Sequence, residues 1–152
     1  MKTLPFANVS INELLFRFPK GREPVEPACS SPVDVFVYSL CKIALMGAEY
    51  DLVQEGEEVL DFLAETLTEP ESLMTAYALV QTRKGRLEYA ESILVRVLDK
   101  KPDYDSAQVA MAGVCILQGK EGWLPTVNQL LATSLNPTVR KCAEKILLSR
   151  SN

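Results

Sequence analysis

Apolar residues recur roughly every three to four positions along most of the chain after residue 30, with charged residues between them. In segment 49–67, for example, Leu52, Val59, Leu60 and Leu63 lie mostly on one stripe opposite a run of acids. Most of these segments end at or near glycine or proline, and no β-hairpin turn signal separates them. The pattern predicts seven helices, within residues 30–47, 49–67, 69–85, 86–102, 104–119, 121–137 and 138–150.

The first of these segments also has some strand character. Val33, Val35 and Val37 alternate as they would in a strand. However, Pro32 after a serine is typical of a helix start, and Gly47 is predicted to end the helix. The length of the segment and the helical segments that follow favour a helix.

The N-terminal residues differ from the rest of the chain. Ser10 and Glu13 form a capping-box pattern, which predicts a short helix over residues 10–18. Its apolar side carries Ile11, Leu14, Leu15 and Phe18. Residues 19–32 hold four of the nine prolines and are predicted to form an extended linker. The chain therefore divides into a short amphipathic helix with its linker (1–32) and a helical domain (33–152).

The helical domain contains a repeat whose period runs from Gly85 to Gly119, and this matches the length of a tetratricopeptide unit, which is about 34 residues. With Gly85 as the turn glycine, the other positions of the pattern are filled by Ala78, Ala90, Leu94 and Pro102. Small residues let two antiparallel helices approach, and proline ends the second helix. A shift by one period leads from Ala78 to Ala112, and one further residue brings the closing proline to Pro137.

The other two units match the pattern less well. The third is irregular because Leu124 and Pro125 replace the small residue of its second helix. A looser first unit spans residues 33–70, with Gly47 at its turn and Pro70 at its end. The predicted fold is all-α, a tetratricopeptide-like α-solenoid of about three helix pairs plus a C-terminal helix.

Stacked helix pairs leave a concave surface that is lined by the first helix of each pair. The positions predicted on this surface are Val37, Tyr38, Cys41 and Leu45, then Thr75, Ala76, Leu79 and Arg83, and finally Val109, Ala110, Gly113, Ile116 and Leu117. This small, apolar lining predicts a groove for an amphipathic partner helix. The alternative is that some of these residues are ordinary core or are covered by the C-terminal helix.

Composition narrows the functional classes. The net charge is −4 and no basic run exceeds two residues, so nucleic-acid binding is not expected. The chain has no histidine, and its four cysteines are too far apart for a CxxC pair. We therefore expect no catalytic residues, no metal site and no cofactor. The first residues contain no signal peptide and no segment is apolar enough to cross a membrane, so a cytosolic location is expected.

The chain resembles a known family over residues 35–149, in blocks that occur in the same order. These blocks are "YSLCKIALMGAEYDLVQEGEEVLDFL", "SLMTAYALVQTRKGRLEYAESILVRVL" and "VAMAGVCILQGKEGWLPTVNQLLATSLNPTVRKCAEKIL". They are similar to the tetratricopeptide-type co-chaperones of the needle protein in bacterial type III secretion systems. Residues 1–32 have no counterpart in that resemblance.

The resemblance implies a bacterial cytosolic virulence protein that holds the needle subunit as a monomer. The groove would bind the subunit's C-terminal amphipathic helix and prevent premature polymerisation, and a second small helical co-chaperone would complete the complex. The groove residues that the resemblance supports are Tyr38, Cys41, Leu45, Leu79, Val109, Ile116 and Leu117. An empty apolar groove is also expected to favour self-association.

Three alternatives stay open at the level of sequence. One is a chaperone for the translocators of the same secretion system, which binds an extended segment. The second is a general tetratricopeptide scaffold, although Arg83 is the only basic residue on the predicted surface. The third is an enzyme, whose catalytic groups would have to be lysine, cysteine or carboxylates because the chain has no histidine. Separately, we hypothesise that the segment "INELLFRF" occupies the groove of its own chain or of a neighbouring copy until a client displaces it; otherwise it is a terminal tail or a cap on the first unit.

Overall fold

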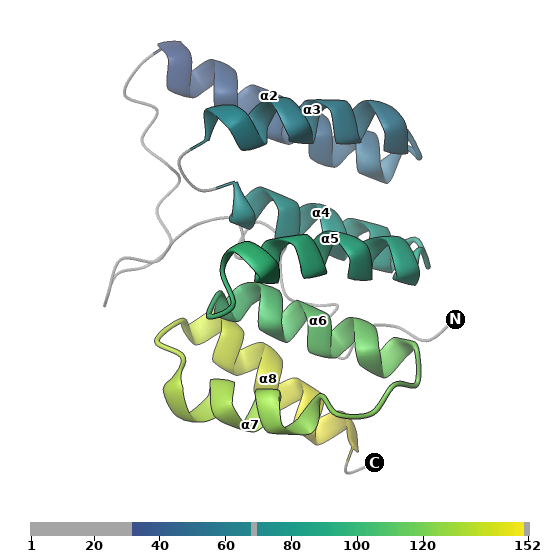
Figure 1. Ribbon diagram of the computed structural model, residues 1–152, viewed down its shortest axis with the longest axis vertical. Helices are drawn as coiled ribbons and strands as arrows, with labels where there is room; N and C mark the ends of the chain where they lie inside the picture. Colours follow the sequence, from purple (N-terminus) through teal and green to yellow (C-terminus); the bar gives the residue numbers. More distant parts are fainter. Residues whose placement is uncertain (1–31, 68–69, 151–152) are drawn as a thin grey trace.

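A computed structural model describes residues 32–67 and 70–150, and over these ranges it consists of seven helices and no strand (Figure 1). The helices are α2 (Pro32–Glu49), α3 (Val53–Thr66), α4 (Glu71–Arg83), α5 (Leu87–Lys100), α6 (Asp105–Leu117), α7 (Leu124–Thr133) and α8 (Pro137–Arg150). The all-α prediction is confirmed, and the valine-rich segment after Pro32 is helical. The short helix predicted at residues 10–18 and its linker lie outside the described residues.

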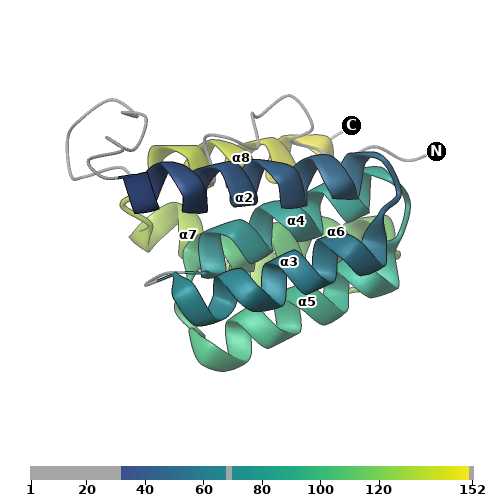
Figure 2. The same ribbon diagram turned by 90° about the horizontal axis from the view of Figure 1, so that it is seen from above.

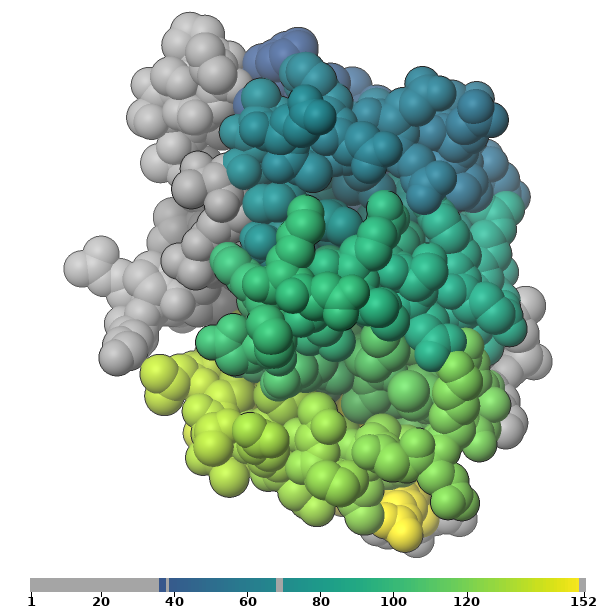
Figure 3. All heavy atoms as spheres, in the orientation of Figure 1, coloured from purple at the N-terminus to yellow at the C-terminus, as the bar shows by residue number. Residues whose placement is uncertain are grey.

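Consecutive helices form pairs, and the pairs stack in chain order (Figures 1 and 2). Helix α2 packs on α3, α4 on α5, and α6 on α7, while the first helices contact one another from α2 to α4 and from α4 to α6. Helix α8 closes the far end of the stack against α6 and α7. The space-filling view shows the same order, from α2 and α3 at one end to α7 at the other (Figure 3). This packing is consistent with a tetratricopeptide-like solenoid of three pairs and a final helix.

The helix bounds repeat with the period predicted from the sequence. Helices α3 and α5 begin one period apart, at Val53 and Leu87. The last residues of α2, α4 and α6 are separated by the same interval. The second helix of the third pair breaks the period, because α7 begins at Leu124 rather than at residue 121. Pro125, which the sequence analysis noted as an irregularity of the third unit, lies in the first turn of this helix.

The turn of the first pair differs from the prediction. Gly47 does not end α2, which continues to Glu49, and Asp51 adopts the left-handed conformation with φ 65°. The backbone N–H of Leu52 donates to the carbonyl oxygen of Gly47 at 2.9 Å, which closes the helix as a Schellman motif. Aspartate tolerates this conformation better than most residues because its short polar side chain can bond locally.

Gly85 and Gly119 end α4 and α6 in the same way, with φ 79° and φ 69°. The N–H of Arg86 donates to the carbonyl oxygen of Gln81 at 3.0 Å, and the N–H of Lys120 donates to that of Cys115 at 2.9 Å. Asp51, Gly85 and Gly119 therefore follow one another at the repeat period and hold equivalent left-handed positions. The distance along the chain from Asp51 to Gly85 therefore equals the distance from Gly85 to Gly119, so the first and second units have the same length.

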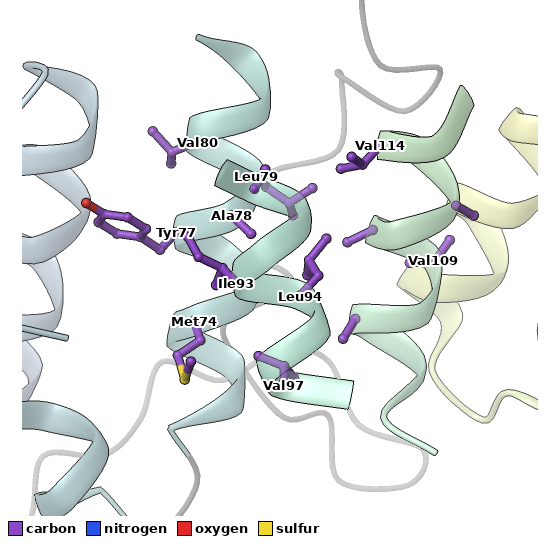
Figure 4. Packing of buried hydrophobic residues seen from close by; sticks show 14 of the residues in the cluster. Met74, Tyr77, Ala78, Leu79, Val80, Ile93, Leu94, Val97, Val109 and Val114 are labelled. Carbon is purple, nitrogen blue, oxygen red and sulfur yellow. The ribbon is translucent and has the colours of Figure 1, made fainter. Parts of the chain in front are cut away.

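The core runs along the stack and is densest around α4, in which every residue from Leu73 to Thr82 is buried. Ala78 on α4 and Ala90 on α5 are fully buried, as expected of small residues in this helix pair. Figure 4 shows the larger buried side chains around Ala78, among them Tyr77, Ile93 and Leu94. Burial of one such side chain stabilises a fold by about 1.5–3 kcal/mol.

Candidate partner-binding surfaces

Of the thirteen positions predicted on the concave surface, nine are the groove candidates for partner binding, and all nine lie on the first helices of the three pairs. Helix α2 carries Val37, Tyr38, Cys41 and Leu45, α4 carries Leu79 and Arg83, and α6 carries Val109, Ile116 and Leu117. Because the helix bounds repeat, residues that lie a whole number of periods apart occupy equivalent positions. Cys41 is thus equivalent to Val109, Leu45 to Leu79, and Arg83 to Leu117.

Burial differs along this set. Leu79 and Val109 are 2% and 0% exposed and belong to the hydrophobic core (Figure 4). Arg83 is exposed, and the side chain of Tyr38 lies outside the described part of the structure. The five other residues are partly exposed and pack against the core, namely Val37, Cys41, Leu45, Ile116 and Leu117. A partner therefore has access first to the α2 and α6 sides of the predicted groove.

Two thiols lie in or near this set, at Cys41 and Cys115. Burial raises the pKa of the Cys41 thiol, and burial followed by the charge of Glu91 raises the pKa of Cys115. Both side chains are therefore neutral thiols near pH 7. Within residues 32–67 and 70–150, no group of three or more carboxylates and cysteines is arranged to hold a metal ion.

A second surface was missed by the sequence analysis. Helices α2 and α3 form one end of the stack, and Figure 2 looks onto this end. It exposes a stripe of large apolar side chains, which we call the outer face and define as Phe36, Leu40, Ile43, Met46, Tyr50, Leu52, Val59 and Phe62. Two hollows of about 250 and 410 Å³ lie along it, one beside Ile43 and Tyr50 and the other between Phe36 and Phe62.

The repeat explains why the outer face is apolar. Ile43 corresponds to Tyr77 and Met46 to Val80, and these two residues of α4 are at most 1% exposed. The hydroxyl of Tyr77 donates to the Val53 carbonyl oxygen of α3, so this side of α4 is covered by the first pair (Figure 4). Ile43 is 55% exposed because no described helix packs on the first pair from outside.

This equivalence could have been found from the sequence, but only with Asp51 at the first turn. With the turn at Gly47, the first unit is four residues out of register and Ile43 does not align with Tyr77. The signal was present in the equal spacing of Asp51, Gly85 and Gly119. The turns were assigned in the sequence analysis by their glycines, because glycine is the usual residue in a left-handed position after a helix. Asp51, which holds that position in the first unit, was therefore overlooked.

Ion pairs join the turns of neighbouring units. The carboxylate of Asp51 lies 3.0 Å from Lys84 Nζ and 3.0 Å from a guanidinium nitrogen of Arg86. Lys84 also donates to the backbone oxygen of Glu49. Glu91 on α5 accepts from Lys120 at 2.6 Å and from Gln118 at 2.8 Å, which ties the third unit to the second.

A further cleft of about 430 Å³ lies between α5, α6 and α7. Val95, Leu98, Met111 and Trp123 form part of its apolar lining, and Asp99 and Glu121 also line it. This cleft is formed by residues other than the nine groove candidates.

Comparisons of the chain with protein-family models, with curated proteins and with solved structures give no match. Among the residues placed by the structure, no helix combines the length and apolar character that a membrane crossing requires.

Proposed function

We propose that the protein is a cytoplasmic chaperone of a bacterial type III secretion system that holds the needle subunit as a monomer before export. The client's C-terminal amphipathic helix would lie across the first helices of the three pairs. The observation that carries the proposal is that α2 and α6 keep partly exposed apolar side chains on the predicted groove, namely Leu45, Ile116 and Leu117. The ordered sequence blocks supply the link to secretion.

The geometry suits a short helix. Neighbouring helix axes in packed proteins lie about 8–10 Å apart, so a client that crosses from α2 to α6 spans about 20 Å. A helix of about 13 residues has this length. Its apolar stripe would replace water over Leu45, Ile116 and Leu117, which are partly exposed in the free chain.

Burial of the client's stripe would also explain the chaperone effect. A subunit that polymerises through an amphipathic helix exposes the stripe while it is a monomer, and a matching apolar surface competes for it. Leu79 and Val109 are buried in the free chain. The client would therefore first contact the partly exposed groove residues of α2 and α6. A second small helical co-chaperone belongs to the proposal as a further partner.

The test is co-expression with the products of neighbouring genes, followed by size-exclusion chromatography and mass spectrometry of the co-eluting proteins. We expect a small helical needle subunit to co-elute. Elution with a large translocator instead would assign the protein to the other chaperone class, and elution alone would overturn the proposal in favour of a scaffold.

Point variants locate the surface. Ile116→Asp and Leu117→Asp should abolish co-elution, because a buried unpaired carboxylate opposes apolar contact. Leu148→Asp is the matched control, since Leu148 is 66% exposed on α8 and lies outside the first helices. Circular dichroism should show the same helix content in all variants. Unchanged client binding by Ile116→Asp would contradict the proposed surface.

A further inference from the structure

The outer face of the first helix pair is a stacking surface with no described helix stacked on it. Its residues Ile43 and Met46 hold the positions that Tyr77 and Val80 hold in the second pair, where a preceding helix pair covers them. Terminal units of solenoids require a cap with a polar outer side. Helix α8 covers the other end of the stack, whereas the described residues provide no such helix at α2 and α3.

The surroundings of the outer face are acidic. Helix α3 carries Glu55, Glu57, Glu58, Asp61 and Glu65 and no basic residue. Two of these acids, Glu55 and Glu58, line the hollow between Phe36 and Phe62. A second copy of the chain would bring two such acidic helices together, which favours repulsion. The complementary occupant is therefore an amphipathic helix that places basic residues beside Glu55 and Glu58.

The N-terminal segment of this chain carries basic residues at one end of a predicted amphipathic helix. Residues 10–18 hold one acid, Glu13, and one base, Arg17, and Lys20 and Arg22 follow before Glu23 and Glu26. The sequence predicts a helix over residues 10–18 with an apolar side. Arg17, Lys20 and Arg22 thus place positive charge at, and just after, the C-terminal end of this helix.

The connecting segment is long enough to allow docking. Thirteen residues, 19–31, separate the predicted helix from α2. They can extend over about 43 Å at 3.3 Å per residue. Helix α2 has 18 residues and a length of about 27 Å, so the segment can reach any point on the outer face. Tethering also raises the effective concentration of the segment to the millimolar range.

We propose that residues 10–18 dock as a helix on the outer face of α2 and α3 and cap the solenoid. In this arrangement the apolar side with Leu14, Leu15 and Phe18 covers Ile43 and the neighbouring stripe, and Arg17 faces Glu58. The cap leaves the concave side of the first helices to the client, so the proposal is independent of the identity of that client.

The first test is a photo-crosslink in the full chain without any client. Leu15 is replaced by p-benzoylphenylalanine, and crosslinked peptides are identified by mass spectrometry after mixing isotopically heavy and light protein. We expect crosslinks within one chain to peptides that contain residues 36–62. The same probe at Leu148 on α8, the helix at the opposite end of the stack, should give none to these peptides.

Three outcomes would overturn the proposal. Crosslinks to α4 and α6 would place the segment in the predicted groove, and crosslinks between heavy and light chains would place it on a second copy. Absence of any crosslink above the level of the Leu148 probe would show that the segment is not docked. None of these outcomes bears on needle-subunit binding, which is measured separately by co-elution.

Exchange of the charges at Arg17 and Glu58 tests the orientation of the docked segment on the outer face. Arg17→Glu and Glu58→Lys should each lower the crosslink yield by about twofold to fivefold, the range expected for one exposed ion pair. The double variant restores the pair with reversed sign and should recover the yield. A double variant that crosslinks no better than the single variants would overturn the placement of Arg17 beside Glu58.

Discussion

The ring of Tyr77 on α4 lies directly against Gly56 on α3, and its hydroxyl donates to the carbonyl oxygen of Val53 at 3.2 Å. A Cβ atom at residue 56 would come within 2.5 Å of the Tyr77 hydroxyl and 3.0 Å of its ring. The missing side chain at Gly56 thus leaves the space in which the Tyr77 ring of the second helix pair packs against the first pair.

Gly56→Ala should therefore destabilise the fold. Alanine favours a helix over glycine by about 1 kcal/mol, but overpacking of a fully buried ring costs about 1–3 kcal/mol. We expect a lower free energy of unfolding in urea, measured by circular dichroism. Gly47→Ala is the matched control, because its Cβ would meet nothing closer than 3.6 Å and should be neutral or stabilising. Equal stability of the two variants would contradict the packing at Tyr77.

The left-handed turn at Gly119 allows a purely conformational test. Its φ is 69° and an added Cβ would meet no atom within 4 Å, so steric packing does not enter. Gly119→Ala should lower the free energy of unfolding by about 1–2 kcal/mol. Gly119→Asn should lower it less, since asparagine tolerates this conformation as Asp51 does in the first unit. The order is read from thermal unfolding, and an alanine variant as stable as the native chain would exclude the strained turn.

Asp51 predicts a dependence of stability on pH. The hydrogen bond from Lys84, together with the charges of Lys84 and Arg86, lowers the pKa of the Asp51 carboxyl. The folded-state pKa is therefore below the unfolded one, and the ionised carboxylate stabilises the fold above the ordinary pKa of about 4. This contribution is lost as the pH falls through the folded-state pKa. The Tm difference between the native chain and Asp51→Asn should shrink as the solution is acidified, and a constant difference would contradict the ion pairs.

The cysteines should react with alkylating reagents at different rates. Cys142 is fully buried, and burial raises the pKa of Cys41 and Cys115, which leaves less of the reactive thiolate. In a Cys29→Ser background at pH 8, we expect Cys41 and Cys115 to react more slowly with iodoacetamide than in urea. Cys142 should react only after unfolding. Peptide mass spectrometry measures each rate, and early labelling of Cys142 would contradict its buried position.

Local sequence patterns were sufficient to predict the described helices. The spacing of apolar residues predicted all seven described helices, and Gly85 and Gly119 marked two of the three left-handed turns between paired helices. Ala78 and Ala90 were also identified as the small residues of one helix pair, and both are buried. These features depend on residues close together in the chain, so a single sequence contains the necessary information.

Local sequence patterns predicted only some properties of the groove residues. The nine residues lie on the expected first helices, and their role in binding stays a prediction. The burial of Leu79 and Val109 depends on surrounding parts of the chain and could not be read from their own segments. The spacing identified the helix that carries each residue, whereas the packing decided its exposure.

The sequence by itself determined the helix order and the repeat period, because helical periodicity and turn residues act over a few positions. Only the tertiary structure showed that Asp51, rather than Gly47, occupies the first left-handed turn. It alone placed Tyr77 on Gly56 and left Ile43 uncovered on the outer face. The physical reason is that both results depend on how one helix pair stacks on the next, and these contacts join residues distant in the chain.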